Sequence, residues 1–144
     1  MGQRIFRDAD SLTLTLNNRI ITCFAVGDNV TITPANQQNS NTPASNGGTT
    51  ASRRTDSDVH DLVINIQKQS IDDVFFNSLI NEPSPTFIEG SLKEDFTRDG
   101  QRGTETWTLD GGVMTTKPTD TKNDQDGNEV LSYTINFRRA VRSI

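Results

Sequence analysis

Residues 130–137 alternate apolar and polar side chains without interruption. The apolar side chains share one side of an extended chain: Leu131, Tyr133, Ile135 and Phe137. A period of two indicates a β-strand with one buried and one hydrated face. The hydrated side carries hydroxyl and amide groups rather than catalytic ones: Ser132, Thr134 and Asn136. The same pattern recurs along most of the chain and favours a structural building block over an enzyme.

Six other segments are predicted to be extended. They are residues 12–16, 19–26, 30–33, 59–67, 87–97 and 104–118. Asn17 and Asn18 separate the first two, and asparagine tolerates the positive φ of a two-residue turn, so a β-hairpin is predicted there. Pro34 is predicted to end the third segment, because proline cannot donate to a ladder. The chain is therefore expected to be mainly β.

Residues 71–80 form the one helix that the sequence predicts. Ser70 is the candidate N-cap, and Asp72 and Asp73 in the first turn suit the positive end of the helix dipole. Helical spacing groups the side chains expected to pack on the outer side of the sheet: Ile71, Val74, Phe75 and Leu79.

Residues 35–58 form a long polar loop, with no large apolar side chain between positions 35 and 52. Such a segment cannot bury enough apolar surface to offset its ordering entropy, so we expect it to be mobile in a free monomer. Loops of this length within one domain are uncommon unless they are functional. We therefore expect a neighbouring molecule to order it.

Length and charge point to one domain that associates with copies of itself. The chain has 144 residues, and its hydrophobic fraction of 31% is low for a globular protein. The net charge of −5 divides into +2 for residues 1–54, −10 for 55–129 and +3 for 130–144. Such blocks favour head-to-tail contacts between acidic and basic patches, with ordinary surface charge as the alternative. A sequence pI near 4.7 argues against a basic nucleic-acid groove.

The residues usually used in chemistry are few. Cys23 and His60 are the only cysteine and the only histidine, so a disulfide, a catalytic triad and a zinc site lack partners. We expect Cys23 to be a buried thiol in a reducing compartment and His60 to be a partly exposed strand residue. Asp124 to Gly127 resemble part of a calcium loop, but Lys122 and Tyr133 occupy two ligand positions. We predict no cofactor, no metal, no secretory signal and no membrane span.

Two stretches resemble phage tail tube proteins, above all those of contractile-tailed phages. One is residues 59–79, a strand followed by an Asp-Asp-Val-Phe-Phe helix. The other is residues 90–137, with Ser-Leu-Lys-Glu-Asp-Phe and the hairpin Trp-Thr-Leu-Asp-Gly-Gly-Val-Met from position 107. The likeness covers most of residues 11–144. It implies a β-sandwich or partly rolled antiparallel sheet with one flanking helix, which forms a continuous barrel on oligomerisation.

The resemblance also implies a function without catalysis. Six subunits would form a ring, and stacked rings would form a channel for DNA ejection, with no specific binding of the DNA. Sheath, baseplate and terminator proteins would be partners, and the subunit would be assembled in the host cytoplasm into the virion tail. Type VI secretion tubes and phage-like bacteriocins share this architecture and remain open. A small β-sandwich module that binds sugar or calcium is the alternative from another class.

Five arginines are the candidate contact residues: Arg53, Arg54, Arg138, Arg139 and Arg142. The first two end the polar loop, which in such families contacts the next ring, and we expect them to meet acidic residues of the 55–129 block there. The other three have no acid nearby in the sequence, and we expect them to bind a neighbouring subunit. The channel is expected to be polar and net negative, because fixed cations would hold phosphates.

Overall fold

The structure, a computed structural model, describes residues 2–25, 27, 29–122 and 130–144. Over these residues the chain is mainly β with one short α-helix, as the sequence predicts. The elements are β1 (Ile5–Leu16), β2 (Arg19–Ile21), β3 (Val30–Pro34), β4 (Asn39–Pro43), β5 (Thr49–Arg53), β6 (His60–Gln67), α1 (Ile71–Ile80), β7 (Ile88–Arg98), β8 (Gln101–Thr116) and β9 (Val130–Ser143).

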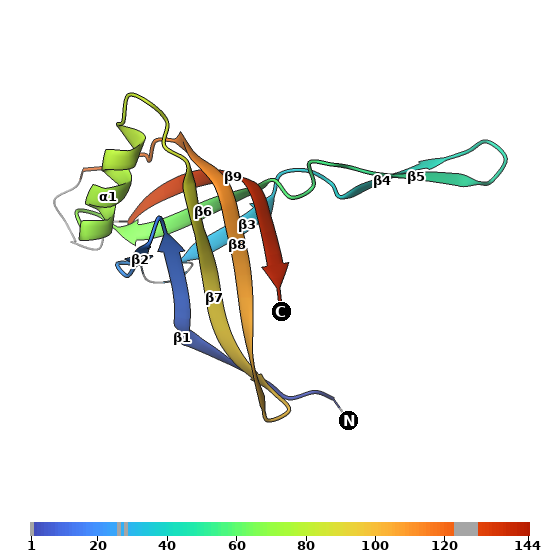
Figure 1. The fold of residues 1–144 in the computed structure, drawn as a ribbon, viewed down its shortest axis with the longest axis horizontal. Helices are drawn as coiled ribbons and strands as arrows, with labels where there is room; N and C mark the ends of the chain where they lie inside the picture. The colour runs from blue at the N-terminus through green and yellow to red at the C-terminus, as the bar shows by residue number, and fades with distance from the viewer. Residues whose placement is uncertain (1, 26, 28, 123–129) are drawn as a thin grey trace.

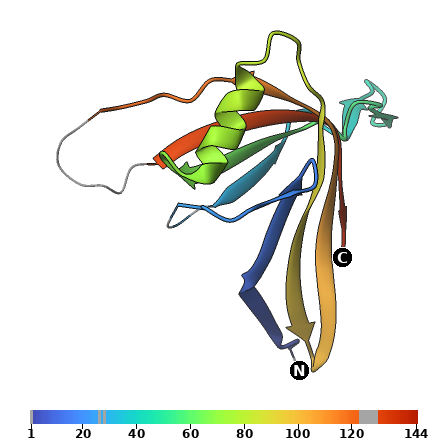
Figure 2. The same ribbon diagram turned by 60° about the vertical axis from the view of Figure 1, so that its left-hand side comes forward.

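Seven strands form one antiparallel sheet in the order β2-β1-β7-β8-β9-β6-β3, and β4 pairs with β5 in a separate hairpin. β1, β7, β8 and the end of β9 extend below the rest, while β6, β3 and the start of β9 cross beside α1 (Figure 1). Seen from the side, the sheet turns steeply between these two halves (Figure 2). Gly111 lies in β8 at an irregularity in its pairing with β7 and has a φ of 64°, and a Cβ there would meet the Arg138 Cβ at 2.9 Å. Glycine relieves both constraints.

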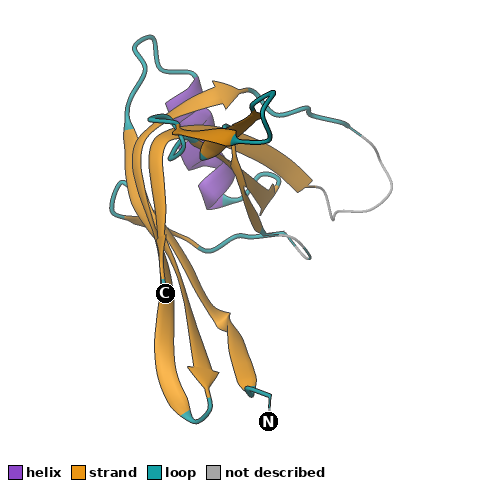
Figure 3. Cartoon of the chain, turned by 90° about the vertical axis from the view of Figure 1, so that its right-hand side faces the viewer, coloured by secondary structure: helices purple, strands orange, loops and turns teal. Residues whose placement is uncertain are grey.

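The lower half of the sheet is a four-stranded unit that we call the blade. It comprises residues 5–15 of β1, 91–98 of β7, 101–110 of β8 and 139–143 of β9. The N-terminus lies at its lower end, and the C-terminus lies part-way along it (Figure 3). The turn between β7 and β8 uses Asp99 and Gly100, both with positive φ, which suits a tight two-residue hairpin.

The core lies where α1 covers the upper half of the sheet. The predicted alternation in β9 is confirmed, since its four apolar residues between positions 131 and 137 are all buried. The Tyr133 ring stacks on Phe76 of α1 at 5.1 Å between centroids, and its hydroxyl donates to Asp73 Oδ1 at 2.6 Å. The largest fully buried apolar side chains come from β1, β6, α1, β7, β8 and β9: Leu14, Leu16, Leu62, Ile64, Ile66, Phe76, Ile88, Leu109, Tyr133, Ile135 and Phe137.

The predicted stripe of α1 is wrong in part. Ile71 and Val74 are 73% and 67% exposed, whereas Phe76 and Asp72 are buried. The Asp72 carboxylate accepts hydrogen bonds from the backbone N–H groups of Thr22 and Cys23, at 2.9 and 2.8 Å. A carboxylate bound in this way must face the sheet. This fixes the rotation of α1 about its own axis, so that Phe76 rather than Phe75 is buried in the core. The predicted Ser70 cap is confirmed, because Ser70 Oγ accepts from the Asp73 N–H.

Two strand boundaries also differ from the prediction. β2 ends at Ile21 instead of continuing to position 26, because the next two N–H groups bind Asp72 rather than a neighbouring strand. β9 continues to Ser143, although alternation in the sequence stops at Phe137. The hairpin between β1 and β2 is confirmed, with φ values of 49° at Asn17 and 64° at Asn18.

The polar loop at 35–58 contains regular structure that the sequence does not predict. β4 and β5 pair in register from Asn39 opposite Arg53 to Pro43 opposite Thr49, and every residue of both strands is exposed. The hairpin projects away from the sheet (Figure 1). Its base is closed by a backbone hydrogen bond from Arg54 N–H to Gln38 O at 2.8 Å. Backbone pairing therefore shapes this segment without any apolar contribution.

Candidate assembly surfaces

The outer side of β1 is an open backbone edge. β2 pairs only with residues 14–16, and no other described strand lies beside β1 away from β7. The Asp99 N–H donates to Arg4 O at 2.9 Å, so the backbone of Arg4 faces β7. Backbone direction alternates along an antiparallel strand, and therefore Ile5 and Arg7 present their N–H and C=O groups outward.

The end of β9 forms a second open edge. The ladder between β9 and β6 stops at Phe137, and beyond it the Ala140 N–H donates to Asp58 O at 2.9 Å. By the same alternation, the backbone groups of Arg142 point outward, away from β8. Among the described residues no strand pairs with β9 on that side beyond Ala140. The blade therefore has one open edge on each side.

The two open edges match in the side-chain face that they present. Across the strands, Arg7 lies opposite Phe96, which lies opposite Gly103. In the same way, Leu92 lies opposite Trp107, which lies opposite Arg142, and residues opposite one another share a face. The outward-pointing residues of both edges thus share the face of the sheet that holds Leu92 and Leu109, which we call the inner face. A strand from a second molecule could join either edge without a shift that would flip its side chains.

The opposite face of the blade, here named the hydroxyl face, is paved with small alcohols. Its hydroxyl-bearing residues at paired positions are Thr13, Thr15, Ser91, Thr97, Thr104, Thr106, Thr108 and Ser143. They lie in rows across the strands, such as Thr13, Lys93, Thr106 and Ser143. At paired positions the charged residues on this face balance in sign, with three acids and three bases: Asp8, Asp95, Asp110, Lys93, Arg102 and Arg139. The surface is hydrated but not acidic.

The C-terminal arginines have acidic neighbours within the chain, which their sequence context does not suggest. Arg142 Nε donates to Glu105 Oε1 at 2.9 Å and lowers the pKa of that carboxyl group. Arg139 Nε lies 3.9 Å from Asp58 Oδ2, a long and exposed ion pair. Arg138 is exposed beside Gly111. The binding of a neighbouring subunit by these three residues stays a prediction.

The two arginines at the end of the polar loop differ in their contacts. Arg54 Nε donates to Asp56 Oδ1 at 3.1 Å, so it meets an acid of the 55–129 block within its own chain. This hydrogen bond, together with the attraction between the two charges, lowers the pKa of the Asp56 carboxyl group and raises the pKa of the Arg54 guanidinium. Arg53 is exposed at the end of β5, opposite Asn39. Contacts of either residue with an adjacent ring stay predictions.

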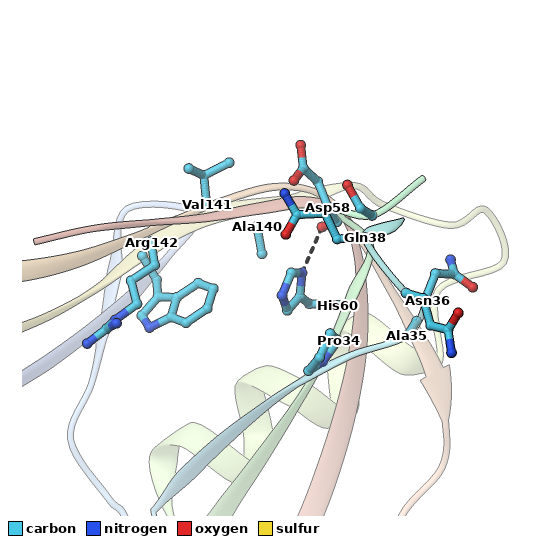
Figure 4. Close-up of a pocket in the computed structure, with 12 residues that line it drawn as sticks. Pro34, Ala35, Asn36, Gln38, Asp58, His60, Ala140, Val141 and Arg142 are labelled. Atoms are coloured by element: carbon cyan, nitrogen blue, oxygen red, sulfur yellow. Dashed lines mark hydrogen bonds between the residues drawn. The ribbon is translucent and has the colours of Figure 1, made fainter. Parts of the chain in front are cut away.

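A cleft of about 660 Å³ opens beside the end of β9. Its lining includes His60 and Trp107, whose rings meet edge to face at 5.5 Å between centroids. Ala140 lies on the cleft side of β9 while Val141 points the other way, and His60 Nδ1 lies 2.8 Å from Asp58 O (Figure 4). Sequence reasoning missed this pair, because β9 separates β6 from β8 in the sheet and only the tertiary structure brings the two rings together.

The remaining predicted residues carry no reactive arrangement in the described part of the chain. His60 is partly exposed, as expected, and Cys23 is half-buried rather than buried. No group of three or more metal-binding side chains occurs in residues 2–25, 27, 29–122 and 130–144. The calcium-like stretch from Asp124 to Gly127 lies outside the described residues. None of the helices that the structure describes has the length and apolar character needed to cross a bilayer.

No protein-family model matches the chain, and no curated protein sequence matches it.

Proposed function

We propose that this protein is the structural subunit of a phage tail inner tube, in which hexameric rings stack into a channel for DNA ejection. The observation that carries the proposal is the blade, a four-stranded antiparallel unit with an open backbone edge along β1 and a shorter one at the end of β9. Open strand edges recruit further strands, and a closed ring removes them. The sequence resemblance to tail tube proteins points the same way.

An even number of strands suits cyclic closure. β1 and β9 run in opposite directions, because each neighbouring pair in the series β1, β7, β8, β9 is antiparallel. Rotation about an axis along the blade preserves strand direction, so β9 of one subunit meets β1 of the next as another antiparallel pair. The matched inner faces of the two edges allow this joint without a bulge.

Six blades would give a barrel of suitable size. Twenty-four strands spaced about 4.8 Å apart and tilted about 40° close at a diameter of roughly 45–50 Å. Side chains reduce this width, and the remaining channel would admit a DNA duplex. The same geometry would serve a secretion tube or a bacteriocin tube.

The hydroxyl face suits the channel wall. α1 and the buried core lie on the inner face of the sheet. In the barrel this face would point away from the channel, so the helix would lie outside and the hydroxyl face would line the channel. Threonine and serine hydrogen-bond water, and balanced charge gives phosphates no net cationic surface to bind. This replaces the expected acidic lining with a neutral one. Exposed Ile71 and Val74 on α1 would then be available to a sheath protein.

The β4–β5 hairpin is the proposed contact between stacked rings. It projects from the molecule, is exposed along its whole length and makes no contribution to the core (Figure 1). A segment of this kind contributes to stability only when a neighbour covers it. Arg53 at its base remains available for an acidic residue of the next ring.

Electron microscopy of the purified protein, together with its mass by light scattering, tests the proposal. Rings with six-fold symmetry or tubes are expected. A monodisperse monomer at high concentration would contradict the proposal and favour the alternative class, a β-sandwich module that binds a small ligand.

A further inference from the structure

We propose that Asn46, in the turn of the β4–β5 hairpin, is a site of spontaneous deamidation, at which the side-chain amide is lost and a carboxylate appears. The inference does not depend on the proposed function, because it concerns the hairpin of the free chain. It follows from the residue after Asn46, from the exposure of the turn and from one hydrogen bond to the side-chain carbonyl oxygen.

Asn46 is the only asparagine in the sequence that glycine follows. Deamidation begins when the backbone nitrogen of the next residue attacks the side-chain carbonyl carbon of the asparagine. A side chain on that next residue hinders the approach, and glycine has none. Beyond Asn46 and Gly48, no atom of the described residues lies within 4 Å of the place that a Cβ of Gly47 would occupy. Neighbouring groups therefore do not shield this nitrogen on that side.

The turn is open to water, which the reaction needs twice. Every residue from 39 to 53 is exposed, and the turn lies at the far end of the projecting hairpin (Figure 1). Water or hydroxide must first take the proton of Gly47, and water must later open the cyclic product. The Gly47 N–H donates to Ala44 O at 3.1 Å. Water can replace this exposed hydrogen bond, so it does not withdraw the nitrogen from the reaction.

A second hydrogen bond of the turn assists the attack. The Gly48 N–H donates to Asn46 Oδ1 at 3.1 Å. When the Gly47 nitrogen adds to the side-chain carbonyl carbon, negative charge develops on this oxygen. A backbone N–H that is already directed at the oxygen stabilises that charge, as the donors of an oxyanion hole do. The turn thus adds a structural contribution to the favourable sequence.

The reaction uses only the chain and water. The Gly47 nitrogen loses its proton and bonds to Cγ of Asn46, the bond from Cγ to the side-chain nitrogen breaks, and ammonia leaves. A five-membered imide remains. Water opens this ring at Cγ to give aspartate, or at the main-chain carbonyl to give isoaspartate, whose backbone is one methylene longer. Residues 39–53 contain no acidic side chain, so either product gives the hairpin its first carboxylate.

Mass spectrometry of the aged full-length chain tests the proposal. The chain is kept at mildly alkaline pH, at a concentration where light scattering finds monomer, and samples are digested with trypsin over time. Cleavage after Arg19 and Arg53 gives one peptide, residues 20–53. Tandem mass spectrometry then assigns each loss of amide to a single position in this peptide. A sample that is digested without ageing gives the background.

Asn39 and Asn41 are matched controls within the same hairpin. Both are exposed, and serine and threonine follow them. We expect Asn46 to lose its amide at least about tenfold faster than either, because only its attacking nitrogen belongs to glycine. The variant Gly47→Ala should remove most of this difference. A parallel sample unfolded in urea tests the turn, and Asn46 should react no more slowly in the folded chain than in urea.

Each outcome decides a separate point. Equal rates at the three asparagines, or a rate at Asn46 that Gly47→Ala leaves unchanged, would overturn the site. A rate in the folded chain well below that in urea would show that the turn protects Asn46, which is the opposite of the role proposed for it. Chromatography separates the two products, and aspartate without isoaspartate would overturn the route through the imide.

Discussion

Asp72 is the residue on which the packing of α1 depends. Burial raises the pKa of this carboxyl group, but the N–H groups of Cys23 and Thr22 and the Arg19 guanidinium outweigh burial and bring the pKa below its ordinary value. A folded-state pKa below the unfolded one means that the carboxylate stabilises the fold above the unfolded pKa, near 3.9, and that this stability is lost as pH falls through the folded value.

Asp72→Asn should therefore lower the free energy of unfolding by about 1–3 kcal/mol at neutral pH, because one buried set of donors loses a charged acceptor. The difference from the wild type should begin to shrink as the pH falls below about 4, where Asp72 of the unfolded chain becomes protonated, and should disappear below the lower pKa of the folded state. Urea denaturation between pH 3 and 7 measures this, with Asp110→Asn on the exposed hydroxyl face as the control. A difference that does not change with pH would show that shape, not charge, is what Asp72 supplies.

Phe76 should contribute more to stability than Phe75. Phe76 is fully buried against Tyr133, so Phe76→Ala should cost about 3–5 kcal/mol through lost burial and a cavity. Phe75 is partly exposed beneath the Arg19 guanidinium, and Phe75→Ala should cost clearly less. Chemical denaturation of the two variants gives the comparison. Equal losses would contradict the orientation of α1 described above.

At the scale of elements, periodicity predicted the strands whose two faces differ in polarity. β6 and the first half of β9 alternate because one face meets the core, and their ladder sets the apolar side chains of the two strands opposite each other. The end of β9 escaped prediction, since Arg138 and Arg139 break the alternation just where the sheet bends. The candidate arginines could be found from charge alone, but their partners Glu105 and Asp58 depend on register.

The β4–β5 hairpin escaped prediction for another reason. Backbone hydrogen bonds hold it, and its side chains carry no apolar pattern that periodicity could detect. Likewise, the rotation of α1 depends on donors at Thr22 and Cys23, far from the helix in sequence. Contacts of this kind follow from tertiary structure and leave no local signal.

The hairpin should be dispensable for folding and required for stacking. Its base is closed by the bond between Arg54 N–H and Gln38 O, so residues 39–53 can be replaced by two glycines without separating the ends. We expect a thermal melt close to that of the wild type, because no residue of β4 or β5 is buried. Electron micrographs should show single rings in place of tubes. If this variant forms tubes of ordinary length, the hairpin has no role in the stacking of rings.

At the scale of the whole molecule, the chain has two parts, the upper half of the sheet and the blade. The upper half holds α1 and most of the core, while the blade has two edges that are unpaired among the described residues. Proteins usually blunt such edges, because unpaired backbone groups invite association. Here the two edges are matched in face and opposite in strand direction, so association would be directed into a closed ring.

The most direct test of this account is a cryo-electron microscopy reconstruction of the assembled protein at a resolution that separates strands. We predict one continuous barrel of twenty-four strands, about 45–50 Å across the backbone, in which β9 of each subunit pairs with β1 of the next. Thr106, Thr108 and their row neighbours should face the channel, with α1 outside. An assembly in which the blade edges stay unpaired, or in which the hydroxyl face points outward, would contradict the account.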